Sequence, residues 1–345
     1  MRRQDRIDYG PGEIHDLEEL RGRPWLRELR LGPAGPHASA EHPLADVSPL
    51  AELRALEVLE VPRSRVADLS PLAGLEALRR LDVSRTRVAD LAPLAGLARL
   101  AHLDVSGTPV SDLGPLRGIA SLAWLGLRDT AVADLSPVAD LPAIRDAARL
   151  DVSGTRVSSL AALERAPRLR ELWAVGAPVE TLPRLPALEV LRIDGTRVSD
   201  LGPLAASPGL RFLSAAGAPL RELVALPGLR ELDVARTEVA DLRPLRGLAE
   251  LEVLSLAETP VADVEPLSGL TGLLELQLQG TRVEDVTALA GLVQLQGLNL
   301  ARTPVHDVTP LAALGNLQWV RLSGSAAIPD TVTALRLRRP NLRVL

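Results

Sequence analysis

Six aromatic side chains are the residues of this chain whose type and position best suit binding chemistry. They are Tyr9, Trp25, Trp124, Trp173, Phe212 and Trp319, in a sequence of 345 residues that is only 2% aromatic. The last four occupy positions where an alternating apolar pattern directs side chains toward solvent. Tryptophan and arginine are enriched among the residues that dominate protein interfaces. The alternative interpretation is that each ring only covers the aliphatic part of a neighbouring side chain.

These aromatic residues are expected to share one surface with nearby polar residues. Adjacent strands of a sheet lie about 4.8 Å apart, so Trp124 and Phe212, four strands apart, are expected at about 19 Å. That separation fits a single protein-sized patch. The predicted partner-binding residues are the anchors Trp124, Trp173 and Phe212, the polar neighbours Asp104, Arg128, Arg149 and Arg192, and Trp319.

A row of aspartates runs beside this patch and allows two interpretations. Asp82 and Asp104 lie on adjacent expected strands, and Asp151 lies two strands further along. Like charges on neighbouring strands repel each other. The surrounding residues Arg80, His102, Arg128 and Arg149 can offset that repulsion. The row is therefore either a self-neutralised, solvated face or a feature that steers a charged partner.

Catalytic chemistry has little support in the sequence. The five histidines, His15, His37, His42, His102 and His306, are scattered, and there is no cysteine. His37 and His42 share one segment with Glu41, where a solvated loop is favoured over a metal site. Nucleophile-elbow, phosphate-loop and zinc-protease motifs are missing from the sequence. We expect no enzymatic activity, no cofactor and no metal.

Composition narrows the classes of partner. The net charge of −5 argues against a nucleic-acid partner, which would favour a basic surface. The sequence contains no run of 18 apolar residues that would predict a membrane span. It also has no apolar run near residue 1 that would predict a secretory signal. We therefore expect a cytoplasmic protein that binds neither membranes nor nucleic acids. All 39 basic residues are arginine, a bias typical of a GC-rich, bacterial genome.

The elements that position these side chains follow a 22-residue period. Self-similarity at this spacing predicts a solenoid of stacked supersecondary units. Within each unit an L-x-V/L core alternates as a half-buried strand does, and the remaining residues supply the crossover to the next parallel strand. The 14 repeats begin at Leu29, Leu59, Leu81, Leu103, Leu125, Leu150, Leu172, Leu191, Leu213, Leu232, Leu254, Leu276, Leu298 and Val320.

Three residue types recur at fixed offsets from the start of each repeat. A threonine five residues on, such as Thr86, can satisfy backbone groups at a buried corner. An aspartate nine residues on, such as Asp90, is expected to be a helix N-cap. A proline three residues later, such as Pro93, fits the first turn of a helix. The spacing leaves room for a 3₁₀ helix or one α turn.

The departures from the period define the expected domain organisation. Residues 1–28 are predicted to be an N-terminal cap with a short amphipathic helix at Ile14, Leu17 and Leu20. Residues 29–325 hold the repeats, which are irregular at 32–43, 125–149, 172–190 and 213–231. Residues 326–345 form a C-terminal cap with a helix from Asp330 to Arg339 and a last strand. The free edge of that strand suggests weak self-association.

The pattern L-x-x-L-x-L-x-x-T-x-V-x-D-L-x-P-L-x-x-L resembles leucine-rich repeats of the internalin type over roughly Leu44 to Leu322. The family more often has asparagine where this chain has threonine. The resemblance implies a curved α/β solenoid, with a parallel sheet on its concave face and short 3₁₀ or helical turns on its convex face. It also implies a non-enzymatic scaffold that binds a protein partner. The alternative is a regulatory or inhibitory subunit of an enzyme encoded elsewhere.

Overall fold

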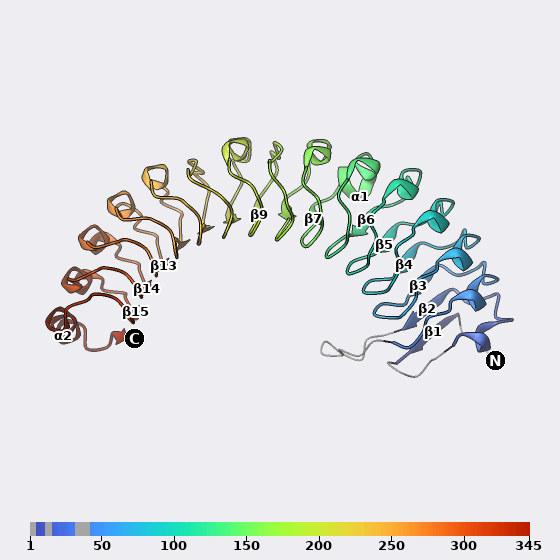
Figure 1. Ribbon diagram of the computed structural model, residues 1–345, viewed down its shortest axis with the longest axis horizontal. Helices are drawn as coiled ribbons and strands as arrows, with labels where there is room; N and C mark the ends of the chain where they lie inside the picture. Colours follow the sequence, from blue (N-terminus) through green and yellow to red (C-terminus); the bar gives the residue numbers. More distant parts are fainter. Residues whose placement is uncertain (1–4, 11–15, 32–41) are drawn as a thin grey trace. The chain divides into compact units, whose positions relative to one another are not determined.

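The computed structural model describes residues 5–10, 16–31 and 42–345. The chain divides into two compact units, Met1–Leu169 and Arg170–Leu345, and each has its own parallel strands and its own leucine-rich interior. Within each unit the strands lie side by side in chain order, with the helical turns on the opposite side of the repeats (Figure 1).

The first unit contains a sheet of six parallel strands in the order β1 to β6. The consecutive starts Leu59, Leu81, Leu103 and Leu125 stand opposite one another in this sheet. A seventh strand, β7, belongs to the same unit but not to this sheet. The strands are β1 (Arg6–Tyr9), β2 (Glu28–Leu31), β3 (Val58–Glu60), β4 (Arg80–Asp82), β5 (His102–Asp104), β6 (Trp124–Gly126) and β7 (Arg149–Asp151).

The second unit contains nine strands, β8 to β16, which also pair in parallel and in chain order. Leu172, Leu191, Leu213 and Leu232 stand opposite one another although two of the three repeats between them are short. The strands are β8 (Glu171–Trp173), β9 (Val190–Arg192), β10 (Phe212–Ser214), β11 (Glu231–Asp233), β12 (Val253–Ser255), β13 (Glu275–Gln277), β14 (Gly297–Asn299), β15 (Trp319–Arg321) and β16 (Arg343–Val344).

Short 3₁₀ helices occupy the return segment of most repeats, as the sequence predicted. In the first unit they are η1 (Glu18–Leu20), η2 (Ser48–Leu50), η3 (Ser70–Leu72), η4 (Ala92–Leu94), η5 (Gly114–Leu116), η6 (Ser136–Val138) and η7 (Ala161–Arg165). In the second they are η8 (Gly202–Ala206), η9 (Arg243–Leu245), η10 (Glu265–Leu267), η11 (Thr287–Gly291) and η12 (Thr309–Ala313). The described residues between β8 and β9, and between β10 and β11, form no helix, because these two repeats lack the Asp-x-x-Pro turn.

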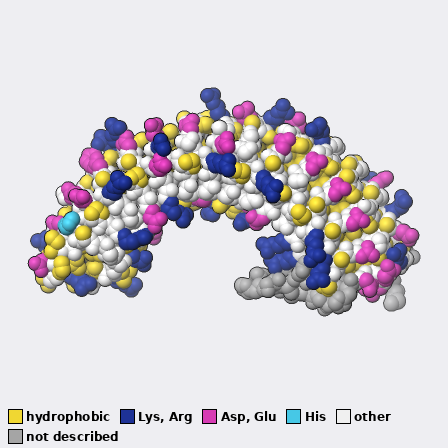
Figure 2. Space-filling model, viewed as in Figure 1, with side chains coloured by type: hydrophobic (Ala, Val, Ile, Leu, Met, Phe, Trp, Pro, Cys, Tyr) yellow, Lys and Arg dark blue, Asp and Glu magenta, His cyan; other side chains and the backbone are white. Residues whose placement is uncertain are grey.

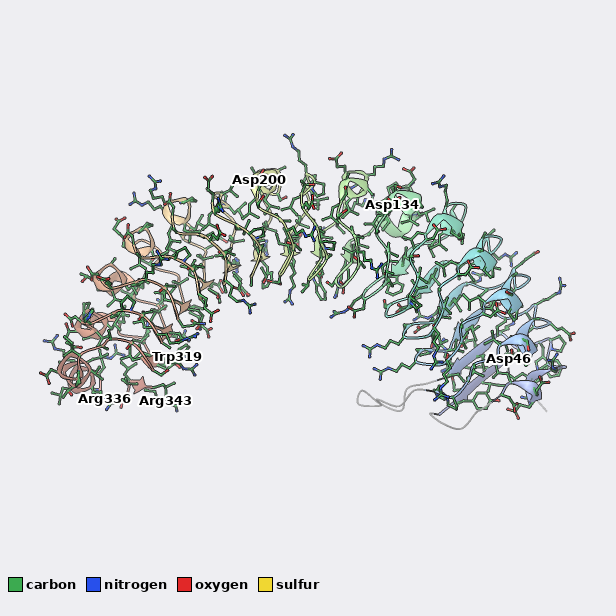
Figure 3. All side chains as sticks on the ribbon, viewed as in Figure 1. Asp46, Asp134, Asp200, Trp319, Arg336 and Arg343 are labelled. Atoms are coloured by element: carbon green, nitrogen blue, oxygen red, sulfur yellow. The ribbon has the colours of Figure 1, made fainter. Side chains whose placement is uncertain are left out.

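The recurring aspartate stabilises these turns from one position earlier than predicted. Asp68 precedes Leu69, which is the N-cap residue of η3 and makes no side-chain cap bond. The Asp68 carboxylate instead accepts the backbone N–H of Ser70, at 2.8 Å, across an Asx-type turn. The N-cap assignment was therefore wrong by one residue, although the carboxylate still satisfies the first free N–H of the helix. Figure 3 shows the corresponding Asp134 and Asp200 on the helical side of their units.

The recurring threonine satisfies a buried carbonyl, as predicted. Thr86 is 6% exposed, and its hydroxyl donates to the carbonyl of Val83 at 2.6 Å. Thr108 makes the same bond to Val105, and Thr196 makes it to Ile193. Because the acceptor belongs to the same repeat, each corner is closed locally, whatever side chains the neighbouring repeats carry.

The N-terminal segment differs from the sequence prediction. Residues 6–9 form a strand, β1, which pairs in parallel with β2 and extends the sheet. Leu17 and Leu20 are buried, but only Glu18–Leu20 is helical, as a 3₁₀ turn. The amphipathic helix was thus a wrong prediction in the described part, while Ile14 lies outside the described residues. An apolar spacing of three fits a 3₁₀ turn as well as an α-helix.

Two α-helices occur in the described residues. The longer one, α2 (Pro329–Arg338), agrees closely with the helix predicted from Asp330 to Arg339, and β16 follows it. The shorter one, α1 (Pro142–Arg145), accounts for part of the extra length of the 25-residue repeat that begins at Leu125. None of the described helices is both long enough and apolar enough to cross a membrane.

Candidate functional site

An arginine lies between two aromatic rings on the strand face of the second unit. Trp173 of β8 stands opposite Arg192 of β9 in the parallel register. The guanidinium carbon of Arg192 lies 5.3 Å from the centroid of the Trp173 ring and 4.9 Å from that of Phe212 on β10. Both distances are within the range of cation–π attraction. We call Trp173, Arg192 and Phe212 the aromatic–arginine cluster.

The cluster is partly buried, and its side chains are packed against one another. Trp173 and Phe212 are half-buried, whereas Arg192 is exposed. Two residues beyond Arg192, the Asp194 carboxylate accepts a bond from the Ser214 hydroxyl at 2.5 Å and one from the backbone N–H of Ala216 at 2.9 Å. Asp194 and Ser214 were not predicted from the sequence. The only signal for them was two polar residues in neighbouring repeats, Asp194 two residues after β9 and Ser214 on β10.

Trp124 of the first unit makes a different contact. Its ring stacks on the imidazole of His102, with ring centroids 3.9 Å apart and planes inclined by 3°. The side chain is 42% exposed, the largest exposure of the aromatic anchors named above. Burial, together with the positive charge of Arg80, lowers the pKa of His102 to about 4. The imidazole is therefore neutral near pH 7, which suits stacking against an indole.

Gly126 allows Trp124 to lie along its own strand. A Cβ atom at Gly126 would lie 2.7 Å from Cη2 of Trp124 and 2.5 Å from Oδ1 of Asp104. Both distances are too short for a real side chain, so the ring and the carboxylate fill the space that a side chain would take. Gly126 was not predicted from the sequence. The signal in the sequence was that Gly126 directly follows a repeat start, a position where most repeats carry a polar side chain.

The aspartate row has a structural role. The carboxylates of Asp82, Asp104 and Asp151 each accept the backbone N–H of the residue two positions further along, at 2.9 Å. Burial raises the pKa of Asp82. Of the two interpretations of this row, these bonds support a face that satisfies itself. Asp104 nevertheless remains partly exposed beside Trp124.

The arginines near the row have partners of their own. Arg80 binds Glu60 at 2.5 Å, between Nε and Oε1. Arg128 lies 3.3 Å from the Asp129 carboxylate and 3.6 Å from that of Asp151. Figure 2 shows acidic and basic side chains interspersed over the visible face of each unit. Because acidic and basic side chains are paired in this way, the charged residues do not form a surface of one sign.

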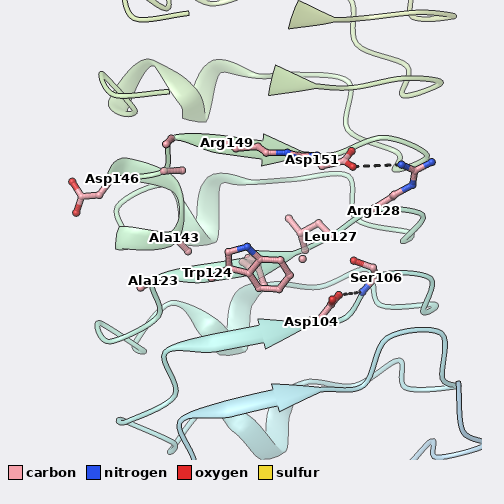
Figure 4. A pocket seen from close by; sticks show the side chains of 14 residues that line it. Asp104, Ser106, Ala123, Trp124, Leu127, Arg128, Ala143, Asp146, Arg149 and Asp151 are labelled. Atoms are coloured by element: carbon pink, nitrogen blue, oxygen red, sulfur yellow. Dashed lines mark hydrogen bonds and ion pairs between the residues drawn. The ribbon is translucent and has the colours of Figure 1, made fainter. Parts of the chain in front are cut away.

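Four of the predicted residues line one hollow in the first unit. Asp104, Trp124, Arg128 and Arg149 surround a cavity of about 570 Å³ between β6 and β7 (Figure 4). Leu125, Leu127 and Ala143 contribute its apolar surface, and Asp146 and Asp151 complete the polar part. Sequence reasoning placed these four residues on one continuous sheet, whereas β6 is the last strand of its sheet.

The remaining predicted residues belong to the second unit. Trp173, Arg192 and Phe212 form the aromatic–arginine cluster. Trp319 lies on β15, where its ring covers the space above Gly297 of the neighbouring strand. Figure 3 places Trp319 on the strand side of the unit. Within the second unit the predicted residues therefore form the cluster and, separately, Trp319. The expected separation of about 19 Å between Trp124 and Phe212 spans two units and stays a prediction.

Metal-binding chemistry has no support in the described residues. No three histidine, aspartate or glutamate side chains gather there as ligands for one ion. His37 and Glu41 of the loop considered above lie outside the described residues, and His42 is 4% exposed. Burial lowers the pKa of His42.

Comparison with known proteins identifies the fold. No protein-family model and no curated protein matches this sequence. A solved internalin (inlF) of Listeria monocytogenes is 22% identical, with a TM-score of 0.69 over 92% of this chain and 86% of that one. A leucine-rich-repeat protein of Leptospira interrogans is 15% identical, with a TM-score of 0.68 over 99% and 89% of the two chains.

A third similar structure is that of a complex. It is a plant peptide hormone receptor, RGFR1, in complex with RGF2. The identity is 14% and the TM-score is 0.65, over 97% of this chain and 68% of that chain. Identities this low establish a shared fold only. The chain therefore has the leucine-rich-repeat fold, and the prediction of an internalin-like solenoid is confirmed at that level.

Proposed function

We propose that this chain is a non-enzymatic leucine-rich-repeat protein that binds a protein partner on its strand face. The observation that carries the proposal is the aromatic–arginine cluster. It places two of the six aromatic rings of the chain, and the arginine between them, on side-chain positions of three adjacent strands. Aromatic and arginine side chains on a rigid support are the usual anchors of protein interfaces.

Rigidity is the proposed source of affinity. The backbone of β8, β9 and β10 is fixed by ladder bonds on successive strands, and the Arg192 guanidinium is held between two rings before any partner arrives. Little side-chain entropy is then lost on association. A similar fold in complex with a peptide hormone, in the plant receptor named above, gives independent support to a polypeptide partner.

The test is a substitution in the cluster compared with one on the helical side of the same unit. Trp173→Ala removes a half-buried ring and is expected to weaken partner binding by about 2 kcal/mol, roughly 30-fold, as loss of an interface anchor does. Thermal unfolding should be nearly unchanged. The partner is captured from native extract with the wild-type chain, and its dissociation constant is then measured by calorimetry for both variants.

The matched control is Val293→Ala. Val293 is 50% exposed and lies between η11 and β14, away from the strand face. This variant should bind the partner like the wild type. Equal loss of binding and of thermal stability in Trp173→Ala would show that the ring is only structural and would refute the proposal. If the captured partner is an enzyme whose rate changes on binding, the regulatory-subunit alternative is selected.

A further inference from the structure

The parallel sheet of the first unit is interrupted at one place. β6 pairs with β5 only, and β7 belongs to the same unit without pairing with β6. Figure 4 shows the hollow between the strand that carries Arg149 and Asp151 and the strand that carries Trp124. The interruption coincides with the 25-residue repeat, whose extra residues form α1 between the two strands. We call the space between β6 and β7 the open strand slot.

Backbone groups face this slot without ladder partners. In a parallel sheet, the backbone N–H and C=O of one residue face one neighbouring strand, and those of the next residue face the other. The N–H and C=O of Leu125 therefore point away from β5. The N–H of Leu127 occupies the same place in its repeat as that of Val105, which donates to the Gly126 carbonyl at 3.1 Å. Among the backbone bonds of the described residues, the Leu127 N–H has no such acceptor.

The slot is bounded at both ends. Beyond the strands, Asp129 donates its N–H to the carbonyl of Ser153 at 2.8 Å, so the two repeats rejoin there. At the other end, Ala143 of α1 donates to the carbonyl of Leu122 at 2.9 Å. Between these bonds lies the hollow of about 570 Å³, with Leu125, Leu127 and Ala143 as its apolar surface. It suits a short extended segment of about three to five residues, at 3.3 Å per residue.

The side chains at the mouth indicate the chemistry of such a segment. The Asp104 carboxylate and the Trp124 ring meet over Gly126, and both residues line the hollow. Asp151 lines the opposite side, and its carboxylate lies 3.6 Å from Arg128. A positively charged side chain in the hollow beside these two groups would meet a carboxylate and the indole together, which is the arrangement that cation–π recognition uses.

We infer that the open strand slot binds an extended peptide segment that carries a basic side chain, by strand addition between β6 and β7. Main-chain groups on the β6 wall supply hydrogen bonds, and Trp124 with Asp104 supplies the preference for a basic residue. The inference deepens the proposed protein-binding function, but it involves residues other than the aromatic–arginine cluster.

The first experiment needs no partner. Amide hydrogen exchange is measured residue by residue in the free protein, comparing Leu127 with Val105, which has the same place in the preceding repeat. We expect Leu127 to exchange at least 100-fold faster, because its N–H faces an empty slot. Exchange of the two amides at similar rates would mean that the sheet is continuous and would overturn the inference.

The second experiment uses a phage-displayed library of random heptapeptides selected on the wild-type chain. Selected peptides should contain Lys or Arg, and they should slow the exchange of the Leu127 amide. Ala148→Trp at the mouth of the slot should weaken their binding at least 10-fold. Ala101→Trp, at the same repeat position just before the paired strand β5, should leave binding within twofold, since Ala101 does not line the slot.

Peptides that bind both tryptophan variants equally, or that leave the exchange of Leu127 unchanged, would refute strand addition. Failure to select any peptide that prefers the wild type over Ala148→Trp would refute it as well. The proposed function fails separately. Trp173→Ala, in the second unit, should leave binding of the selected peptides unchanged, whether or not it affects the natural partner.

Discussion

At the scale of single residues, His102 shows how a neighbour decides the role of a titratable group. The imidazole is stacked on Trp124 and lies near Arg80, and both its burial and that positive charge disfavour protonation. The folded state therefore holds the neutral form at pH values where an unfolded chain would be protonated. Stacking of a neutral ring against an indole keeps Trp124 at the mouth of the open strand slot.

We predict that His102 titrates with a pKa of about 4 in the folded protein. Because this value is below the ordinary histidine pKa of 6.5, the unfolded chain binds more protons than the folded chain between pH 4 and 6.5. The contribution of His102 to stability is thus complete above pH 6.5 and is lost as the pH falls toward 4. NMR titration of the imidazole measures the pKa directly, and urea unfolding at several pH values measures the linkage.

His102→Gln is the control for this linkage. It should reduce the fall in stability between pH 6.5 and 4, while the other titratable groups continue to contribute. An imidazole that titrates near 6.5 in the folded protein would contradict the stacked, desolvated arrangement.

At the scale of one repeat, the corner after a strand contains a residue in the left-handed backbone conformation. The residue four positions after a strand start has a positive φ in both units, and in several repeats it is glycine, such as Gly107 and Gly280. Elsewhere it carries a side chain, as in Arg85 with φ of 55° and Arg236 with φ of 57°. L-residues with side chains pay a steric cost in this region of about 1–2 kcal/mol.

We predict that the double variant Arg85→Gly and Arg236→Gly raises the stability of the fold by about 1 kcal/mol in total. Each glycine removes the steric cost of a left-handed backbone, and the larger conformational freedom of glycine in the unfolded chain offsets part of that gain. Each backbone N–H keeps its bond, to Ser106 at 2.6 Å and to Ala257 at 2.7 Å. Thermal unfolding is the measurement.

The control is the double alanine variant at the same two positions. It removes the same side chains but keeps the Cβ atoms, so no gain is expected from it. A gain of equal size with alanine would mean that the arginine side chains, and not the backbone conformation, limit the stability of these corners.

At the scale of the whole molecule, stability depends on contacts between neighbouring repeats. The chain has two compact units, and the sheet of the first unit ends at β6. Interior leucines such as Leu81 and Leu254 are fully buried within their own unit. Self-association through the edge of β16, the last strand in the second unit, stays a prediction.

We predict that the two units open in separate steps. The amide of Val83, bonded to Asp104, reports on the first unit, and that of Leu278, bonded to Asn299, reports on the second. Native-state hydrogen exchange in increasing urea should give different opening free energies and different urea slopes for these amides. Identical values over the full urea range would show one cooperative transition instead.

The sequence alone determined the features that arise within one repeat. The strand starts from Leu59 to Val320, the threonine hydroxyl bonds and the 3₁₀ turns were all predicted, because each depends on residues close in sequence or one period away. The one-residue error at the aspartate turn has the same local origin. Asp68 binds the N–H two residues further along, and the spacing alone does not distinguish this bond from an N-cap bond.

The tertiary structure decided how the predicted binding residues are grouped. Whether Arg192 lies between Trp173 and Phe212, and whether Trp124 stacks on His102, depends on rotamers that only the packed neighbours select. The extra residues after Leu125 could have formed a surface loop on a continuous sheet. They form α1 beside an interrupted sheet instead. This outcome depends on ladder bonds and core packing between residues far apart in sequence, which only the folded chain brings together.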